Sequence, residues 1–268
     1  MLNLDYFLQK TKRFSYLSRI DIVNTIYKAK GGHVGGSLSV IDILSSVYAL
    51  KEKYDFEFVL SKGHCLLAWL VTLIRIGELD KSILESFYLD NSSFGGHPKK
   101  GSSSSITWST GSLGHGLSIT LGKAFASPNK NFICVLGDGE TNEGSVWEAL
   151  MFMSQHKLTN VLVIIDNNKQ ESLTFTDDIL SIENLNDRLK GFGLKALRID
   201  GHDHEQILDN LLSYFTDRDV DNVPKVIIAD TIKGKGISFM EKVPKWHHRK
   251  LTPEEHTLAI EELTNCKV

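Results

Sequence analysis

Apolar residues recur at helical spacing along the first part of the chain. In segment 16–30 they stand three or four residues apart, which predicts an amphipathic helix. The residues on this face are Leu17, Ile20, Val23, Ile26 and Tyr27. Ser37 or Ser39 is suited to cap a second helix that runs through Leu50, with Asp42 favourably placed in its first turn.

Two more helices are predicted before residue 130. Segment 65–76 is strongly apolar, so we expect a buried helix there. Segment 116–126 is rich in small residues and is followed by Pro128, which cannot continue a helix. The glycine- and serine-rich stretch 101–105 predicts a loop.

From residue 132 onward, apolar strand-like runs alternate with helical segments. The predicted strands are 132–136, 161–165, 195–199 and 225–230, and the predicted helices are 143–156, about 181–191 and 204–215. This alternation predicts a parallel sheet covered by helices on both faces. The strands are apolar throughout, which fits because parallel strands are buried on both sides. We therefore expect an α/β fold with its ligand site beyond the carboxyl ends of the strands.

Polar residues stand at these strand ends. Gly137-Asp138-Gly139 follows the first run, Asn167-Asn168 follows the second, and Asp230 ends the last. A carboxylate and a carboxamide on two neighbouring strand ends can hold one hard divalent cation. Mg²⁺ usually completes its shell with phosphates, and the flanking glycines would let a diphosphate approach the backbone closely.

Composition narrows the class of protein. The chain has 268 residues, of which 41% are apolar and 24% charged, with a net charge of −3. This length suits one large α/β domain or two small ones, and no flexible linker is visible. No basic stripe predicts a nucleic-acid partner. The longest apolar runs are short of the about 20 residues of a membrane span, and no signal sequence is recognisable.

Three cysteines, Cys65, Cys134 and Cys266, are widely spaced and form neither a disulfide framework nor a CxxC metal pair. A reducing cytoplasmic location is therefore expected.

Taken together, the motifs resemble those of thiamine diphosphate (ThDP) enzymes. Over about 16–250 the chain resembles the N-terminal subunit of a split transketolase, because the motifs occur in the family order. They are GGHVGG at 31–36, LSKGH at 60–64, GGHP at 95–98, STGSLGHG at 109–116, GDGETNEGSVWEA at 137–149, the Asn pair at 167–168, DGHD at 200–203, KGKG at 233–236 and WH at 246–247.

The resemblance implies a set of cofactor ligands. Asp138, Asn168 and the backbone carbonyl of Gln170 would hold Mg²⁺, or Ca²⁺ or Mn²⁺ in its place. Gly137 and Gly139 would lie against the diphosphate. The segment that follows the Asn pair departs from the usual family pattern, so Gln170 is less secure than the two side-chain ligands.

Four glycine-flanked or loop histidines match family positions. The resemblance implies that His33 and His97 contact the substrate hydroxyl and carbonyl, and that His64 lies near the diphosphate. His247 would reach the donor sugar or the diphosphate, although the neighbouring His248 is an alternative. Imidazole titrates near neutrality, which suits proton transfer to and from sugar hydroxyls.

Two other motifs complete the implied site. Gly111 and Leu113 would contact the aminopyrimidine of the cofactor through their backbone, and His115 has no assigned chemistry. Glu143 would lie at a subunit interface near the cofactor, or would simply stabilise the start of a helix. For Asp200–Asp203 we favour a turn that caps the following helix.

The implied activity is that of a transketolase, which transfers a two-carbon ketol unit from a ketose or ketose phosphate to an aldose. The chain would form a single ThDP-binding domain over 1–268 and lack the pyrimidine-binding and C-terminal domains. We therefore expect a separate C-terminal subunit, in an α₂β₂ assembly.

Three alternatives are open. One is a pyruvate-using relative of 1-deoxyxylulose-5-phosphate synthase, and another is a non-catalytic regulatory subunit with the same fold. The third is a plain nucleotide-binding α/β domain, which is disfavoured because the sequence has no GxGxxG or Walker lysine motif.

Overall fold

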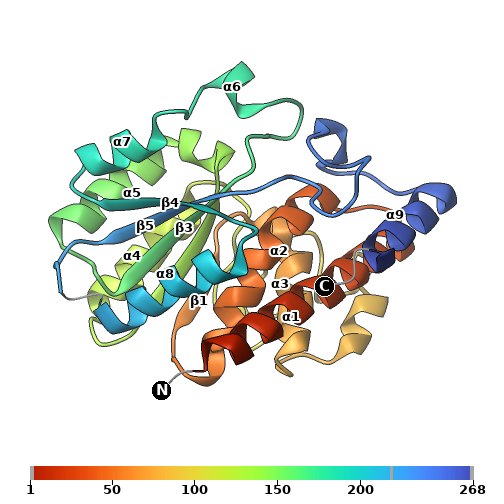
Figure 1. The fold of residues 1–268 in the computed structure, drawn as a ribbon, viewed down its shortest axis with the longest axis horizontal. Coiled ribbons are helices and arrows are strands. Elements are labelled where there is room, and N and C mark those ends of the chain that lie inside the picture. Colours follow the sequence, from red (N-terminus) through yellow and green to blue (C-terminus); the bar gives the residue numbers. More distant parts are fainter. Residues whose placement is uncertain (1–2, 218–219, 266–268) are drawn as a thin grey trace.

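A parallel five-stranded sheet forms the centre of the computed structural model, which describes residues 3–217 and 220–265 (Figure 1). The strand order is β1-β2-β3-β5-β4, and every neighbouring pair is parallel. The strands are β1 (Glu57–Leu60), β2 (Phe132–Gly137), β3 (Val161–Asn167), β4 (Lys195–Asp200) and β5 (Lys225–Asp230). The α/β class and the parallel sheet predicted from the sequence are confirmed.

Helices cover both faces of this sheet. One face carries α1 (Leu4–Lys28), α2 (Val34–Ala49), α3 (Leu66–Arg75), α8 (His204–Asp217) and α9 (Pro253–Asn265), and the other carries α4 (His115–Ala126), α5 (Gly144–Gln155) and α7 (Leu185–Gly191). Successive strand residues alternate between the two cores, as Ile133 and Val135 join the first and Cys134 and Leu136 the second. Two separate apolar cores therefore fix the sheet from both sides.

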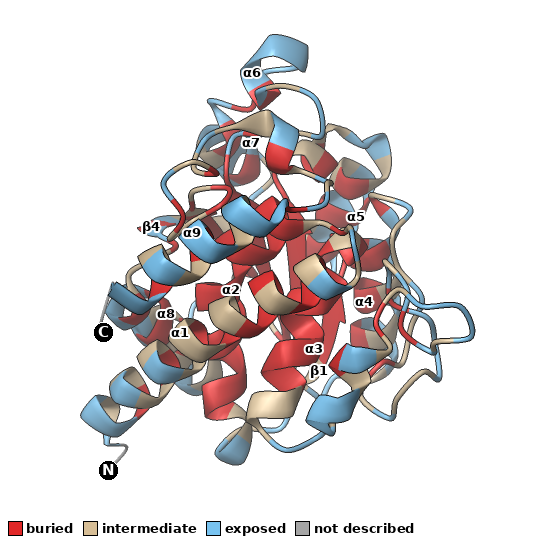
Figure 2. Ribbon diagram, turned by 90° about the vertical axis from the view of Figure 1, so that its right-hand side faces the viewer, coloured by how far each residue is buried: buried red, intermediate tan, exposed pale blue. Residues whose placement is uncertain are grey.

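Helix α2 is the most deeply buried helix near the sheet, and all of its residues are buried (Figure 2). By length and composition the segment Val34–Glu52 is apolar enough to cross a membrane, which corrects the expectation that all apolar runs are too short. However, 94% of its apolar window is buried inside the fold.

The predicted start of α2 is wrong. The helix begins at Val34 with His33 as N-cap, so neither Ser37 nor Ser39 caps it. Asp42 lies in the middle of the helix, where it forms an ion pair with Arg19 of α1. A basic partner on another helix, rather than the macrodipole, explains the acidic residue at this position.

Other boundaries also differ from the prediction. Helix α1 begins at Leu4 instead of residue 16, and the helix predicted at about 181–191 is α7, which begins at Leu185 after the short α6 (Thr176–Ile179). Strand β1 and helix α9 were not predicted. Strand β1 has only four residues and is recognisable through its pairing with β2, whereas α9 buries only two residues, Ala259 and Leu263.

Cys65 and Cys134 are free and buried. Cys266 lies outside the described residues.

Candidate functional site

The polar strand ends meet at one edge of the sheet, as predicted. The register pairs Gly137 with Asp166 across β2 and β3, and Asn167 with Asp230 across β3 and β5. A cavity of about 260 Å³ opens there. All predicted site residues except Glu143 line it: His33, His64, His97, Gly111, Leu113, Gly137, Asp138, Gly139, Asn168, Gln170 and His247.

Asp138 is a buried carboxylate at the end of β2, with 2% of its surface exposed. Oδ1 accepts a hydrogen bond from the backbone N–H of Gly139 at 2.9 Å, and Oδ2 accepts one from the backbone N–H of Lys169 at 2.5 Å. Burial, together with the nearby charge of Asp166, raises the pKa of Asp138 to about 6. The charge of Lys62 lowers this pKa but does not outweigh burial, so a bound cation would further stabilise the ionised form of Asp138.

Asn168 follows the end of β3 and is also buried. Its Oδ1 accepts a hydrogen bond from the N–H of Gln170 at 3.1 Å, and its Nδ2 donates to Ser39 at 3.3 Å. These contacts fix the orientation of the carboxamide. Oxygen atoms of Asp138 and Asn168 have lone pairs beyond those used here, so both side chains fit a site for a hard divalent cation.

The structure supports Gln170, the third predicted ligand, less directly than Asp138 and Asn168. Its carbonyl oxygen accepts a hydrogen bond from Nζ of Lys233 at 3.2 Å, while its side-chain Oε1 is buried without a hydrogen-bond partner. Among the described residues, no group of three or more His, Cys, Asp or Glu side chains could hold a metal ion. The predicted set contains only one carboxylate, and its other members are amide oxygens.

A buried ion pair lies beneath these residues and was not predicted. Lys62 pairs with Asp166, and both side chains are almost fully buried. Asp166 also accepts hydrogen bonds from Ser39, at 2.7 Å, and from Thr231. Burial lowers the pKa of Lys62, but the charge and hydrogen bond of Asp166, together with the charges of Cys65 and Asp138, leave this pKa raised. The two residues could have been singled out from the sequence, because Lys62 lies within the LSKGH motif and Asp166 directly precedes the Asn pair.

Lys233 is a second lysine in the cavity. Its Nζ donates to the carbonyl of Glu171 at 2.8 Å and lies 2.9 Å from Nδ1 of His247. Burial and the charge of Lys62 lower the pKa of Lys233 to about 8. Lys62 and Lys233 share the lining of this cavity with the acidic residues Asp138, Glu140 and Glu171. Lys62 is already paired with Asp166, so Lys233 is the lysine better placed to meet a negatively charged ligand.

The histidines converge as predicted. The ring centre of His33 lies 5.4 Å from that of His64, 5.7 Å from that of His97 and 5.2 Å from that of His247. The Nδ1 atom of His33 is buried and has no hydrogen-bond partner among the described residues. The exposed His248 also approaches His33, at 4.6 Å between ring centres, but does not line the cavity, so the geometry favours His247 over His248.

Burial keeps these imidazoles neutral. It lowers the pKa of His33 to about 3, with further contributions from His248 and His97. Burial and the charge of Lys233 lower the pKa of His247 to about 3. The pKa values of His64 and His97 are also lowered, mainly by burial. A neutral imidazole has one donor and one acceptor nitrogen, so these rings can both give and accept hydrogen bonds.

Glycines allow the histidine loops to pack together. Gly111 has φ +133°, and a Cβ there would lie 2.6 Å from Cδ2 of His97. A Cβ at Gly63 would lie 2.8 Å from the backbone nitrogen of Gly111. The loops that carry His64, His97 and Gly111 can therefore approach only because the contacting residues lack side chains.

Glu143 lies outside the cavity. It is exposed and occupies the N-cap position of α5, where its side chain makes no capping bond. Glu140 is the buried acid of this motif instead: Oε1 accepts the N–H of Gly114 at 2.9 Å, and Oε2 accepts that of Gly137 at 3.2 Å. Sequence reasoning missed Glu140, which ties the glycine loop before α4 to the end of β2.

The remaining motif residues behave as expected. Asp203 accepts hydrogen bonds from the N–H groups of Glu205 and Gln206, which confirms the predicted cap of α8. His115 is exposed at the start of α4.

Comparisons with known proteins agree with this geometry. A family model described as "Transketolase, thiamine diphosphate binding domain" matches residues 11–263. One subunit of the apulose-4-phosphate transketolase of Phocaeicola vulgatus is 36% identical over 262 residues, which cover 92% of this chain and 91% of that protein. The 6-deoxy-6-sulfo-D-fructose transketolase subunit SqwG of a Clostridium species is 33% identical, with 87% and 88% covered.

Longer relatives match over part of their length. Human transketolase is 30% identical over 271 residues, which cover 96% of this chain and 42% of that protein. The crystal structure of transketolase from Campylobacter jejuni superposes with a TM-score of 0.82 at 27% identity, covering 97% of this chain and 43% of that chain. The fold described above is therefore the fold of that part of the longer proteins.

Proposed function

Because the chain belongs to the transketolase family as its thiamine diphosphate-binding domain, we propose that it is the N-terminal subunit of a two-chain, ThDP- and Mg²⁺-dependent transketolase. The observation that carries the proposal is the convergence of the predicted residues on one cavity. Four histidines, two lysines and the oxygen ligands come from loops far apart in sequence, yet they line the same space.

Each part of the cavity has a role in this proposal. Asp138, Asn168 and the carbonyl of Gln170 hold the cation, and Gly137, Gly139 and His64 lie against the diphosphate. Gly111 and Leu113 hold the aminopyrimidine. When bound, ThDP supplies the electron sink for the two-carbon unit.

The histidines would then handle substrate protons. His33 and His97 hydrogen-bond to a hydroxyl and a carbonyl of the substrate, and His247 contacts the donor sugar or the diphosphate. Their neutral state at pH 7 suits this role, because a neutral ring can accept a proton from one oxygen and return it to another.

A partner chain is proposed on two grounds. Several relatives of similar length are named as single subunits of a transketolase, not as the whole enzyme. In addition, the cavity of about 260 Å³ is smaller than the roughly 300–1,000 Å³ of typical ligand pockets, as expected if another chain supplies part of its wall. We propose a separate C-terminal subunit, assembled as α₂β₂ in the cytoplasm, with the exposed Glu143 at the interface.

The substrate class is a sugar or sugar phosphate. Relatives are named for apulose 4-phosphate and for 6-deoxy-6-sulfo-D-fructose, so related subunits serve more than one ketose. The cavity residues named here do not distinguish between such donors.

The test is calorimetric titration of ThDP and Mg²⁺ into the chain, with and without the C-terminal subunit, followed by a ketol-transfer assay on a panel of ketose phosphates. We expect binding and turnover only with both subunits. Absence of ThDP binding to the complex would contradict the proposed function, and efficient turnover by the chain alone would contradict the need for a partner. Turnover of pyruvate instead of a ketose would identify the alternative enzyme class.

A further inference from the structure

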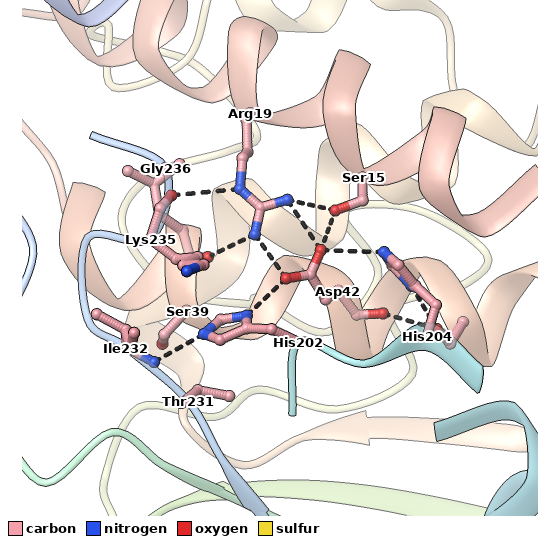
Figure 3. A network of polar contacts seen from close by, with 12 residues as sticks. Ser15, Arg19, Ser39, Asp42, His202, His204, Thr231, Ile232, Lys235 and Gly236 are labelled. Atoms are coloured by element: carbon pink, nitrogen blue, oxygen red, sulfur yellow. Dashed lines mark hydrogen bonds and ion pairs between the residues drawn. The ribbon is translucent and has the colours of Figure 1, made fainter. Parts of the chain in front are cut away.

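A second polar cluster lies next to the cavity, centred on Asp42 (Figure 3). The carboxylate of Asp42 pairs with Arg19, with Nη2 2.6 Å from Oδ2 and Nη1 2.8 Å from Oδ1. His202, in the turn between β4 and α8, is 2.7 Å from Oδ2 through its Nδ1. His204 approaches Oδ1 at 3.4 Å. The cluster joins α1, α2 and the start of α8, but none of these side chains lines the cofactor cavity.

The hydrogen bonds of His202 fix its tautomer. Its Nε2 lies 2.8 Å from the backbone nitrogen of Ile232, which is a donor, so Nε2 must be the acceptor. The proton of the neutral ring is therefore on Nδ1, and it is donated to Asp42. His202 thus connects a buried carboxylate on one side to a backbone N–H on the other.

Ile232 belongs to the segment that follows β5. The strand ends at Asp230, and among the residues that the structure describes the N–H of Ile232 donates to Nε2 of His202 instead of to a strand partner. The preceding Thr231 donates its hydroxyl to Asp166. The following Lys233 extends into the cavity, where its ammonium group contacts the carbonyls of Gln170 and Glu171.

We propose that His202 is a positioning residue for Lys233: it holds the N–H of Ile232 through Nε2 and thereby places the ammonium group of Lys233 for the diphosphate end of the cofactor. This inference rests on the proposed function. Asp42 acts through His202, because it fixes the tautomer that leaves Nε2 free to accept. Arg19 reinforces the same segment, since its Nε donates to the carbonyl of Lys235 at 3.3 Å.

Two substitutions of His202 separate its two hydrogen bonds. In His202→Asn the amide nitrogen takes the place of Nδ1 and can still donate to Asp42, but nothing accepts the N–H of Ile232. In His202→Gln the amide oxygen reaches the place of Nε2 and can accept from Ile232, but the donor to Asp42 is lost. If His202 positions Lys233, the first variant loses cofactor affinity and the second keeps it.

The first measurement is the ThDP dissociation constant of the two-subunit complex in Mg²⁺, determined by calorimetry. Loss of one partly buried hydrogen bond in the Asn variant should raise this dissociation constant about fivefold. The Gln variant should stay within about twofold of the wild type, although it should unfold at a lower denaturant concentration, because Asp42 has lost a donor. The Asn variant should therefore show the larger loss of ThDP affinity, and the Gln variant the larger loss of stability.

The control is His204→Gln, because His204 also contacts Asp42 and Ser46 but does not reach the segment that follows β5. It should lower stability and leave the dissociation constant unchanged. Equal dissociation constants for the Asn and Gln variants of His202, or affinity losses that follow stability in all three, would overturn the inference.

A second measurement needs no cofactor. Amide hydrogen exchange of segment 231–236 in the isolated chain should be faster in the Asn variant than in the Gln variant. Equal exchange would overturn the inference by itself. Failure of the wild-type complex to bind ThDP would contradict the proposed function instead, so the two failures are distinguishable.

Discussion

Asp42 and Asp138 are both buried carboxylates near the carboxyl edge of the sheet, but their surroundings differ. Asp42 has a guanidinium group, a hydroxyl and two imidazoles around it, and although burial raises its pKa, Arg19 lowers it well below the usual value. Asp138 has only backbone N–H groups and one distant hydroxyl as direct partners, and its pKa is raised to about 6. The fold satisfies the first carboxylate more fully than the second, which is the one proposed to hold a cation.

This difference in surroundings indicates that Asp42 mainly stabilises the fold, whereas Asp138 mainly serves ligand binding in the proposed function. Replacing Asp42 should affect folding most, because it removes one half of a buried ion pair. Replacing Asp138 should affect binding most, because the fold supplies no direct counter-charge at that position. The largest expected effect is therefore on the unfolding of an Asp42 variant, and the smallest is on the titration of the cavity histidines.

Asp42→Asn should lower the free energy of unfolding by about 3–5 kcal/mol, because the largely buried Arg19, 11% of whose side chain is exposed, loses its carboxylate. Denaturant unfolding of the isolated chain measures this. Asp55→Asn is the matched control, since Asp55 forms an exposed pair with Lys51 and its loss should leave the unfolding free energy unchanged. A loss of less than about 1 kcal/mol at Asp42, the level of a surface pair, would show that Asp42 is not the structural carboxylate.

Asp138→Asn should weaken the binding of ThDP in Mg²⁺ by about 100-fold, which corresponds to ~2.7 kcal/mol, because the proposed cation site loses the one carboxylate in its predicted ligand set. The free energy of unfolding of the chain without cofactor should change by no more than about 1 kcal/mol, because the substitution removes a poorly compensated buried charge while losing one hydrogen bond. Calorimetry and denaturant unfolding measure the two effects. Chelation of Mg²⁺ should abolish ThDP binding to the wild type and hardly affect the variant.

Gly111→Ala tests whether close loop packing, and not only electrostatics, builds the cavity. The new Cβ would stand 2.6 Å from His97 in a backbone conformation that L-residues rarely adopt, so stability should fall by about 1–3 kcal/mol. Gly122→Ala in α4 is the control, because a Cβ there meets no atom within 4 Å, and it should stabilise the helix by roughly 0.5–1 kcal/mol. Denaturant unfolding of both variants measures the difference, and equal effects of the two substitutions would contradict the argument.

The sequence predicted the carboxyl edge of the sheet well for a physical reason. Asp138 and Asn168 follow apolar runs that alternate with helical segments, a pattern typical of buried parallel strands, and such strands end at a common edge. The histidine motifs could be placed only through the resemblance to a family, because loops that meet in space leave no periodic signal.

What the sequence could not predict depends on tertiary contacts. Glu140 and Glu143 are both acidic residues after the same glycine, and only the packing of the loop before α4 shows that Glu140 is the buried one. Asp42 resembled a residue of a first helical turn until the structure placed Arg19 and His202 beside it. Strand β1 is too short to recognise without its neighbour β2.

The smallest predicted effect concerns the neutral histidines of the cavity. The pKa of His33 is about 3 in the folded chain, against about 6.5 in an unfolded one, so between these values only the unfolded chain binds the proton. Stability should therefore fall as the pH decreases below about 6.5, and His33 should account for ~1.4 kcal/mol per pH unit of that slope. In His33→Asn the slope should be smaller by this amount, whereas in His115→Asn, where the side chain is exposed, it should equal that of the wild type.

Denaturant unfolding of the chain without cofactor, between about pH 7 and pH 4.5, measures both slopes because this range lies across the unfolded pKa of histidine. An unchanged slope in His33→Asn would mean that the cavity tolerates the charged ring. In that case the histidines would not share the poor compensation seen at Asp138. The contrast with Asp42 would then apply to Asp138 alone.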